Sequence, residues 1–324
     1  MQHLFAEIGW YREIDYKPFV PIYLIYLDWK VFLYLILRKV VEMNNLKSNL
    51  VRKKENKVKK VSYQGLPFAY SHLTSKALFE KAELISKETF EDVFQDVHDG
   101  NTDIGVVPIE NTKAGYVNEV YDLLLEYNLY INYGYIRKID HCLAGTYDGK
   151  LEDVLEVHSH PQALMQCKNY LKKHKLKLVN EINTAVAAKK IRDEKDKTKA
   201  CLCSKEAALH YGLKVLKEEL NPKENYTRFA AISKKLIKDK NHNRISILFK
   251  VPHKAGALDK VISMFAQNNL SLSSIYSRPD MTSPWKYLFY LDFDGNILDE
   301  KVSNVLNDLE KDLPYLKILG SYSI

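Results

Sequence analysis

Strand-like and helix-like segments alternate along residues 60–235, and this rhythm limits the fold more than any other feature. Residues 103–108 form a short apolar run, which is typical of a strand buried in a parallel sheet. A helical face with i, i+3, i+4, i+7 spacing is formed by Phe90, Val93, Phe94 and Val97. Because strands that alternate with helices build parallel sheets, we predict an α/β domain over residues 60–235.

The C-terminal residues 243–324 have a different pattern. Apolar side chains alternate with polar ones along residues 244–251, which indicates a half-buried strand. The segments that follow read as helix, strand, strand, helix and strand. This order predicts a ferredoxin-like βαββαβ domain. The polar segment 234–243 reads as the linker that joins it to the α/β domain.

The N-terminal extension, residues 1–59, is assigned to neither domain. Residues 19–37 are strongly apolar and approach the roughly 20 residues of a membrane span. Asp28 and Lys30 interrupt this stretch, and each costs about 2.5–3.5 kcal/mol on insertion scales. Three interpretations stay open: an upstream extension with Met43 as the true start, an accessory helical segment, or a membrane anchor. We do not expect a membrane partner.

The net charge of +7 is concentrated in a basic run between Arg52 and Lys60. Such a run is usually a solvated linker, so we expect no nucleic-acid partner. The cysteines are Cys142, Cys167, Cys201 and Cys203. Their spacing favours buried, reduced thiols in a cytoplasmic protein, with a metal site as the alternative.

Polar residues follow the predicted strands where ligands bind in open α/β sheets. Asn111 and Thr112 come after the strand at residues 103–108, where they could hold an anion or simply cap a helix. Ser159 and His160 follow the next such strand. A histidine in this position could carry a proton, although a lone histidine is more often structural.

Two further groups have the same arrangement. Thr184 follows a candidate strand at residues 176–181, and Thr227 and Arg228 stand just before the apolar residues 230–232. An arginine there could form a bidentate pair with a substrate carboxylate, or a structural ion pair. None of these groups alone names a reaction.

Taken together, the short motifs occur in an order that resembles prephenate dehydratases. In chain order they are Tyr63-Gln64-Gly65, Pro108-Ile109-Glu110-Asn111, His141-Cys142-Leu143, Ser159-His160-Pro161-Gln162-Ala163, Thr184-Ala185 and Asn225-Tyr226-Thr227-Arg228-Phe229. The C-terminal unit is similar to the ACT regulatory domain of that family, with the signature stretches Gly256-Ala257-Leu258 and Ser277-Arg278-Pro279. The resemblance covers residues 60–324.

The resemblance implies a two-lobed catalytic domain with mixed and parallel sheets, like a periplasmic binding protein, followed by the ACT domain. It implies that prephenate loses CO2 and water to give phenylpyruvate, without metal or cofactor, and that Thr227 is required. A threonine hydroxyl is a poor acid at neutral pH, so we interpret Thr227 as a placed hydrogen-bond donor. The candidate substrate-binding residues are Asn111, Thr112, Ser159, Thr184, Arg228 and Phe229.

For the ACT domain, the resemblance implies that L-phenylalanine binds between two such units, so the protein should be a homodimer or homotetramer. The candidate regulatory residues are Gly256, Ala257, Leu258, Asn269, Ser277 and Arg278. The sequence departs from the family pattern at Phe68, Val186 and Tyr276, where a glycine, a small residue and a glutamate are usual. The first two could reshape the substrate pocket, and the third puts phenylalanine control in doubt.

Two rival functions stay open at this point. An arogenate dehydratase would have the same fold and chemistry, and the sequence does not discriminate between prephenate and arogenate. A non-catalytic amino-acid sensor could use the same two domains, but the intact Thr227-Arg228-Phe229 argues against it.

Overall fold

The computed structural model describes residues 58–280 and 286–324. The apolar stretch 19–37, Met43 and nearly all of the basic run lie outside the described residues, so the interpretations of the extension stay predictions. The residues from Lys57 onward form one unit. Within its described part, no helix has both the length and the apolar character needed to span a membrane.

The first lobe is an α/β layer built on a mixed sheet. Its elements are β1 (Lys60–Gln64), α3 (Tyr70–Leu78), β2 (Glu83–Lys87), α4 (Phe90–Asp99), β3 (Ile104–Asn111), β4 (Gly115–Tyr116), α5 (Asn118–Glu126), β5 (Tyr130–Lys138) and β11 (Tyr226–Ser233). The strand order is β5-β11-β3-β1-β2. β1 runs parallel to β2 and β3, whereas β11 is antiparallel to β3 and β5.

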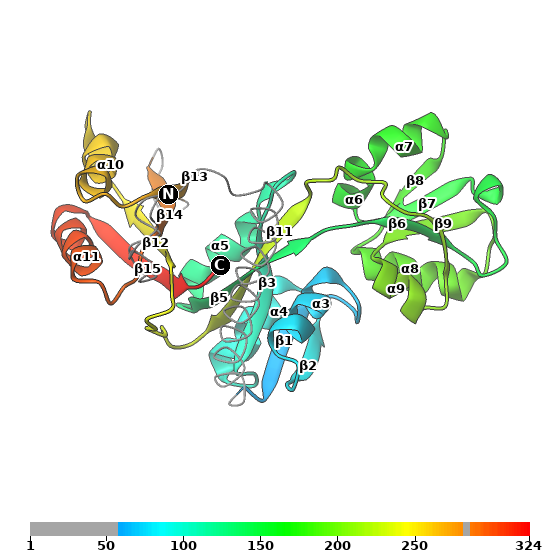
Figure 1. The fold of residues 1–324 in the computed structure, drawn as a ribbon, viewed down its shortest axis with the longest axis horizontal. Coiled ribbons are helices and arrows are strands. Elements are labelled where there is room, and N and C mark those ends of the chain that lie inside the picture. The colour runs from blue at the N-terminus through cyan, green and yellow to red at the C-terminus, as the bar shows by residue number, and fades with distance from the viewer. Residues whose placement is uncertain (1–57, 281–285) are drawn as a thin grey trace, which may run out of the picture. The chain divides into compact units, whose positions relative to one another are not determined.

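The second lobe has its own five-stranded sheet, with the order β10-β6-β9-β7-β8. Its elements are β6 (Cys142–Gly145), the short 3-10 helix η1 (Leu151–Asp153), β7 (Glu156–Ser159), α6 (Pro161–Gln166), α7 (Lys168–Lys173), β8 (Lys177–Asn180), α8 (Thr184–Glu194), β9 (Lys199–Cys203), α9 (Lys205–His210) and β10 (Lys214–Lys217). The chain crosses between the lobes twice, after β5 and after β10 (Figure 1). All four cysteines are buried, as predicted, and all are free thiols.

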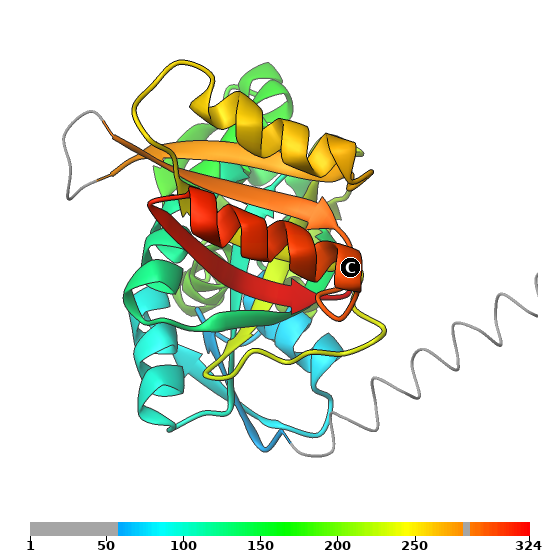
Figure 2. The same ribbon diagram turned by 90° about the vertical axis from the view of Figure 1, so that its left-hand side faces the viewer.

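The C-terminal unit has the predicted βαββαβ order. Its elements are β12 (Arg244–Lys250), α10 (Ala257–Gln267), β13 (Leu272–Pro279), β14 (Tyr287–Asp294), α11 (Glu300–Asp312) and β15 (Tyr315–Tyr322). The strands pair antiparallel in the order β13-β14-β12-β15. Figure 2 shows α10 and α11 side by side on one face of this sheet. Their apolar stripes, Val261 and Phe265 on one helix and Val302, Val305 and Leu309 on the other, form the core against it.

The sheet of the C-terminal unit continues into the first lobe, which the sequence pattern did not predict. β15 runs parallel to β5, with Gly320 opposite Ile131, so one sheet extends from β13 to β2. A Cβ atom on Gly320 would lie 2.3 Å from the carbonyl oxygen of Ile131. Only a glycine permits this approach of the two backbones. The opposite face of the C-terminal sheet is therefore covered by α5 and its neighbours, whose side chains share one core with Leu248 and Tyr290.

Three local features bear on the site. The motif at residues 225–229 lies largely inside β11. The helical segment after β7 is divided at Cys167 into α6 and α7. The helix α3 begins at Tyr70. The first turns of α3 bury Ser71, Thr74 and Ser75 rather than an apolar stripe. The hydroxyls of Thr74 and Ser75 donate to the carbonyls of Tyr70 and Ser71.

Candidate active site

A cavity of about 610 Å³ is lined by residues from both lobes. The first lobe contributes the carboxyl end of β3 and the first residues of β11, with Asn111, Thr227 and Phe229. The second lobe contributes the start of α8 with Thr184, and the segment after β7 with His160. These are strand ends and helix starts, as expected for a ligand site in α/β sheets.

Thr227 is buried at this cavity and its hydroxyl is fixed by Asn111. Asn111 Nδ2 donates to Thr227 Oγ1 at 2.9 Å. The amide is itself locked, because Asn111 Oδ1 accepts from the backbone N–H groups of Lys113 and Ala114, each at 2.9 Å. Since the hydroxyl oxygen already accepts a hydrogen bond, its own proton remains to be donated into the cavity.

A chain of amides continues from Asn111 into the second lobe. Asn111 Nδ2 also lies 3.0 Å from Asn225 Oδ1, and Asn225 Nδ2 donates to Gln166 Oε1 at 2.9 Å. Gln166 Oε1 in turn lies 3.2 Å from His141 Nε2. Burial lowers the pKa of His141 to about 4, so its imidazole is neutral at physiological pH. The chain therefore joins the two lobes behind the cavity through neutral groups.

The cavity wall carries no lysine or arginine among residues 58–280 and 286–324. Its donors are amides, hydroxyls and imidazoles, together with the start of α3, which no side chain caps. At the start of α8, Asn183 Oδ1 already accepts from the N–H groups of Ala185 and Val186. The two carboxylates on the wall, Glu88 and Glu119, are exposed. The site is thus polar and largely uncharged.

Four of the predicted substrate-binding and catalytic residues line the cavity, and three do not. Asn111, Thr184, Thr227 and Phe229 are on its wall, whereas Thr112, Ser159 and Arg228 are not. Ser159 is fully buried and its hydroxyl donates to the carbonyl of Leu202 at 2.7 Å. The hydroxyl of Thr112 donates to the carbonyl of Glu224 and accepts from the N–H of Tyr226. Both hydroxyls therefore hold the backbone rather than face the cavity.

Arg228 points away from the cavity into the junction with the C-terminal unit, because side chains alternate along β11. Its Nη1 donates to Asp292 Oδ2 at 2.5 Å and to the hydroxyl of Tyr322 at 3.3 Å, and Nη2 pairs with Glu110 Oε2 at 2.9 Å. Burial opposes the charged form, but the attraction of Asp292 outweighs it and raises the pKa of Arg228. Of the two roles left open by the sequence, the geometry favours the structural ion pair.

Two departures from the family pattern also lie off the cavity wall. Phe68 has a left-handed backbone conformation, with φ of 68°, which explains why a glycine suits this position. Its ring stacks on His210 of α9, with centroids 4.0 Å apart, and so bridges the two lobes. Val186 lies on α8 and is absent from the cavity wall. Neither side chain supports the expectation that these departures reshape the pocket directly.

The sequence reasoning gave no role to Gln166, Asn225 and His141, which the structure brings together. Asn225 and His141 stood inside quoted motifs, but the motifs alone did not show that they meet. Gln166 lies one helical turn after Gln162 on α6, and both line the cavity. That i, i+4 spacing of two amides was the available signal for a polar helix face.

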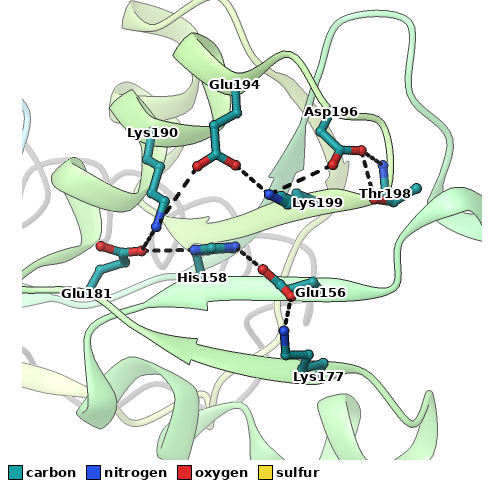
Figure 3. Close-up of polar contacts among 9 residues, drawn as sticks. All are labelled: Glu156, His158, Lys177, Glu181, Lys190, Glu194, Asp196, Thr198 and Lys199. Atoms are coloured by element: carbon teal, nitrogen blue, oxygen red, sulfur yellow. Dashed lines mark hydrogen bonds and ion pairs between the residues drawn. The ribbon is translucent and has the colours of Figure 1, made fainter.

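An ionic network joins β7, β8, β9 and α8 of the second lobe (Figure 3). The buried imidazole of His158 lies between two carboxylates, with Nδ1 2.9 Å from Glu181 Oε1 and Nε2 2.7 Å from Glu156 Oε1. Lys190 pairs with Glu181 at 2.8 Å and Lys177 with Glu156 at 2.6 Å. Glu181 directly precedes the cavity residues 182–184, so the network ties this part of the wall to β7 and α8.

Acid is expected to weaken this network. Burial opposes ionisation of Glu181, but hydrogen bonds from His158 and Lys190 outweigh it and hold its pKa below the ordinary value of 4.5. A lowered pKa in the folded state stabilises the protein above the ordinary value, and this stabilisation is lost as pH falls through the folded-state pKa. The melting temperature of the wild type should therefore exceed that of Glu181→Gln at about pH 6, and the gap should narrow towards about pH 3.5.

The exposed Glu152 provides the control for this titration. Glu152→Gln should track the wild type across the same pH range. A difference in melting temperature between the wild type and Glu181→Gln that stays constant with pH would contradict the lowered pKa of Glu181.

The fold and the site define a two-lobed α/β protein of the periplasmic-binding-protein type, with a polar interlobe cavity and a C-terminal βαββαβ unit. Residues 61–236 match the family model described as prephenate dehydratase. The chain belongs to the prephenate dehydratase family, which is a family of enzymes.

Similar proteins cover most of the chain. The prephenate dehydratase of Methanocaldococcus jannaschii is 40% identical over 239 residues, which are 72% of this chain and 85% of that protein. The chloroplastic arogenate dehydratase/prephenate dehydratase 2 of Arabidopsis thaliana is 35% identical over 279 residues, 82% of this chain and 73% of that protein.

Solved structures agree on the fold. Prephenate dehydratase from Arthrobacter aurescens in complex with L-Phe has a TM-score of 0.74 at 25% identity, covering 82% of this chain and 90% of that one. GqqA, described as a novel type of quorum quenching acylase, has a TM-score of 0.75 at 28% identity, covering 82% of this chain and 98% of that one. The fold therefore does not by itself fix the reaction.

Proposed function

We propose that this protein catalyses the decarboxylating dehydration of prephenate to phenylpyruvate, the dehydration step of L-phenylalanine biosynthesis. The observation that carries the proposal is the fixed hydroxyl of Thr227. Asn111 donates to its oxygen, which leaves the hydroxyl proton for a leaving group inside the cavity. A preorganised donor aimed at developing charge is among the largest contributions to catalysis.

A wall without lysine or arginine among the described residues suits the second half of the reaction. Prephenate carries two carboxylates, and the ring carboxylate must leave as CO2. A cation beside it would stabilise the ground state and slow decarboxylation, because only interactions that strengthen in the transition state raise turnover. Neutral donors such as Gln166, Asn183 and Thr184 can hold the side-chain carboxylate without this penalty.

A second candidate substrate is arogenate, whose side chain carries an ammonium where prephenate has a keto oxygen. Glu88 and Glu119 are carboxylates on the cavity wall, and an ammonium would pair with either of them. The relatives named arogenate dehydratase point the same way.

A turnover assay of the full-length protein with both substrates decides between them. The formation of phenylpyruvate is measured by its ultraviolet absorbance. We expect a higher kcat/KM for prephenate than for arogenate, whose product is phenylalanine. The matched variants Glu88→Gln and Glu119→Gln should lower only the arogenate reaction. Absence of turnover with either substrate would refute the proposed function.

We also propose that residues 60–235 form the catalytic domain and residues 243–324 an ACT regulatory domain for L-phenylalanine. A second cavity of about 350 Å³ is lined by Gly256, Ala257 and Leu258 at the start of α10. Gly256 has φ of 75°, and no side chain caps the start of α10. The N–H of Ala257 donates to the carbonyl of Lys254, so the N–H groups after it are the ones that can hold a carboxylate. Asn269, Ser277 and Arg278 do not line this cavity.

Titration calorimetry on the full-length protein tests this regulatory site. L-phenylalanine should bind, and Leu258→Ala should weaken binding several-fold because the side chain lines the cavity. D-phenylalanine provides the matched control ligand. No heat at millimolar L-phenylalanine would remove the proposal.

We further propose a cytoplasmic homodimer or homotetramer. Exposed apolar side chains on the C-terminal unit, Ile262, Ile275 and Tyr287, support association through this unit. Light scattering after size-exclusion chromatography measures the mass of the assembly, and fractionation of the host cell tests the location.

A further inference from the structure

Strand β13 of the C-terminal unit contacts the wall of the interlobe cavity through Tyr276. The ring of Tyr276 stacks on Tyr116, with centroids 4.3 Å apart and an interplanar angle of 21°. Its hydroxyl donates to Asn118 Oδ1 at 2.7 Å. Tyr116 and Asn118 both line the cavity, whereas Tyr276 does not. The C-terminal unit therefore contacts this wall from behind.

The neighbouring Arg278 holds the same segment by its backbone. Its Nη1 donates to the carbonyl oxygen of Asn118 at 2.7 Å and pairs with Asp122 Oδ1 at 2.6 Å. Side chains alternate along a strand, so Tyr276 and Arg278 lie on the same face of β13. Two successive side chains of that face therefore contact one short segment of the first lobe, formed by β4 and the start of α5.

In this segment, no side chain caps the start of α5. Val117, at the N-cap position of α5, makes no side-chain hydrogen bond to the helix. The preceding strand β4 consists only of Gly115 and Tyr116. Within the first lobe, β4 pairs with β3 and the N–H of Val117 donates to the carbonyl of Ile109 at 3.0 Å. The contacts from β13 supplement these backbone bonds with interactions to the side chains of Tyr116 and Asn118.

The stack belongs to a wider aromatic cluster across the junction. Tyr116 also meets Tyr121 edge-on at 5.8 Å, and Tyr121 meets Tyr290 of β14 at 4.7 Å. The hydroxyl of Tyr276 fixes the orientation of the Asn118 side chain, because an amide whose oxygen accepts a bond turns its NH2 group the other way. A tyrosine can do both tasks, whereas the glutamate usual at this position could not stack.

We propose that Tyr276 is a positioning residue for substrate binding, acting through Tyr116 and Asn118 to hold the wall formed by β4 and the start of α5. The inference rests on the proposed function for its kinetic readout. It makes the C-terminal unit a structural part of the catalytic cavity, whether or not that unit binds a regulator.

Steady-state kinetics of the full-length protein tests this role. Tyr276→Ala should raise KM for prephenate about five- to tenfold, the size expected when a stack and a hydrogen bond are lost, and change kcat less than about twofold. Tyr276→Phe keeps the ring and should recover most of the affinity. The matched controls are Tyr147→Ala and Tyr147→Phe, because Tyr147 is 83% exposed in the second lobe.

A double-mutant cycle separates positioning from general destabilisation. If Tyr276 acts through Tyr116, the double variant Tyr116→Ala with Tyr276→Ala should bind prephenate little worse than Tyr116→Ala alone. Fully additive effects on KM would overturn the proposal, as would a KM for Tyr276→Ala equal to that of Tyr147→Ala.

Hydrogen exchange supplies a readout that needs no activity. Tyr276→Ala should speed deuterium uptake at residues 115–121, and Tyr147→Ala should not, because only the first removes the contacts that hold this segment. If the wild type turned over neither substrate, the proposed function would fail while exchange still decided the positioning role. Unchanged uptake at residues 115–121 in Tyr276→Ala would refute it.

Discussion

Replacing Thr227 by alanine is expected to lower kcat for prephenate about 10²–10³-fold while KM changes less than about threefold. The hydroxyl is the group that Asn111 orients towards the cavity, and it would contact the departing hydroxyl mainly as charge develops on that oxygen. An interaction made mainly in the transition state affects kcat rather than KM. Steady-state kinetics with purified variants measures both quantities.

The controls for this prediction separate the loss of the hydroxyl from other effects of replacing Thr227. Thr227→Ser retains the hydroxyl and should recover turnover to within about tenfold of the wild type. Thr198→Ala removes an exposed hydroxyl that donates to Asp196 and should leave kcat unchanged. Turnover of Thr227→Ala within a few-fold of the wild type would show that the assignment of Thr227 is wrong.

At Thr112 the structure differs from what the sequence led us to expect. The sequence placed Thr112 beside Asn111 as a substrate donor, but its hydroxyl joins the backbone of residues 224 and 226 instead. The reason is that β3 ends at Asn111 and Thr112 lies in the turn that follows, beside the start of β11.

The parts of the fold that the sequence predicted are those carried by local periodicity. The βαββαβ order follows from apolar stripes such as those of α10 and α11, and the buried strand β3 from its apolar run. Contacts between distant residues were not predictable in this way. Thr227 and Asn111 are 116 positions apart, and nothing in their local pattern states that β11 pairs with β3.

The junction between the first lobe and the C-terminal unit illustrates the same limit. Its pairing of Gly320 with Ile131 depends on one glycine without a turn motif, in a segment that reads as an ordinary strand. The motif containing Thr227 was recognisable only as a set of residues. The structure divides it by strand alternation into Thr227 and Phe229, which face the cavity, and Arg228, which faces the junction.

This alternation means that one strand serves both chemistry and domain assembly. Arg228 is 9% exposed and Asp292 is 5% exposed, so their ion pair is buried. Asp292 also accepts hydrogen bonds from the hydroxyls of Ser246 and Ser274, which satisfy its remaining lone pairs. A buried pair satisfied in this way tolerates the loss of neither partner, because the remaining charge is left without compensation.

Asp292→Asn is accordingly expected to lower the free energy of unfolding by about 3–5 kcal/mol, since it removes the main counter-charge of the buried Arg228. The matched control is Asp294→Asn on the same strand, because the pair of Asp294 with Arg244 at 2.9 Å leaves the carboxylate half-exposed. Such a surface pair contributes about 0–1 kcal/mol. Urea unfolding measures both variants. Equal free energies of unfolding for the two variants would contradict a structural role for the pair of Arg228 and Asp292. A raised KM in Asp292→Asn without loss of stability would instead favour Arg228 as a clamp for a substrate carboxylate.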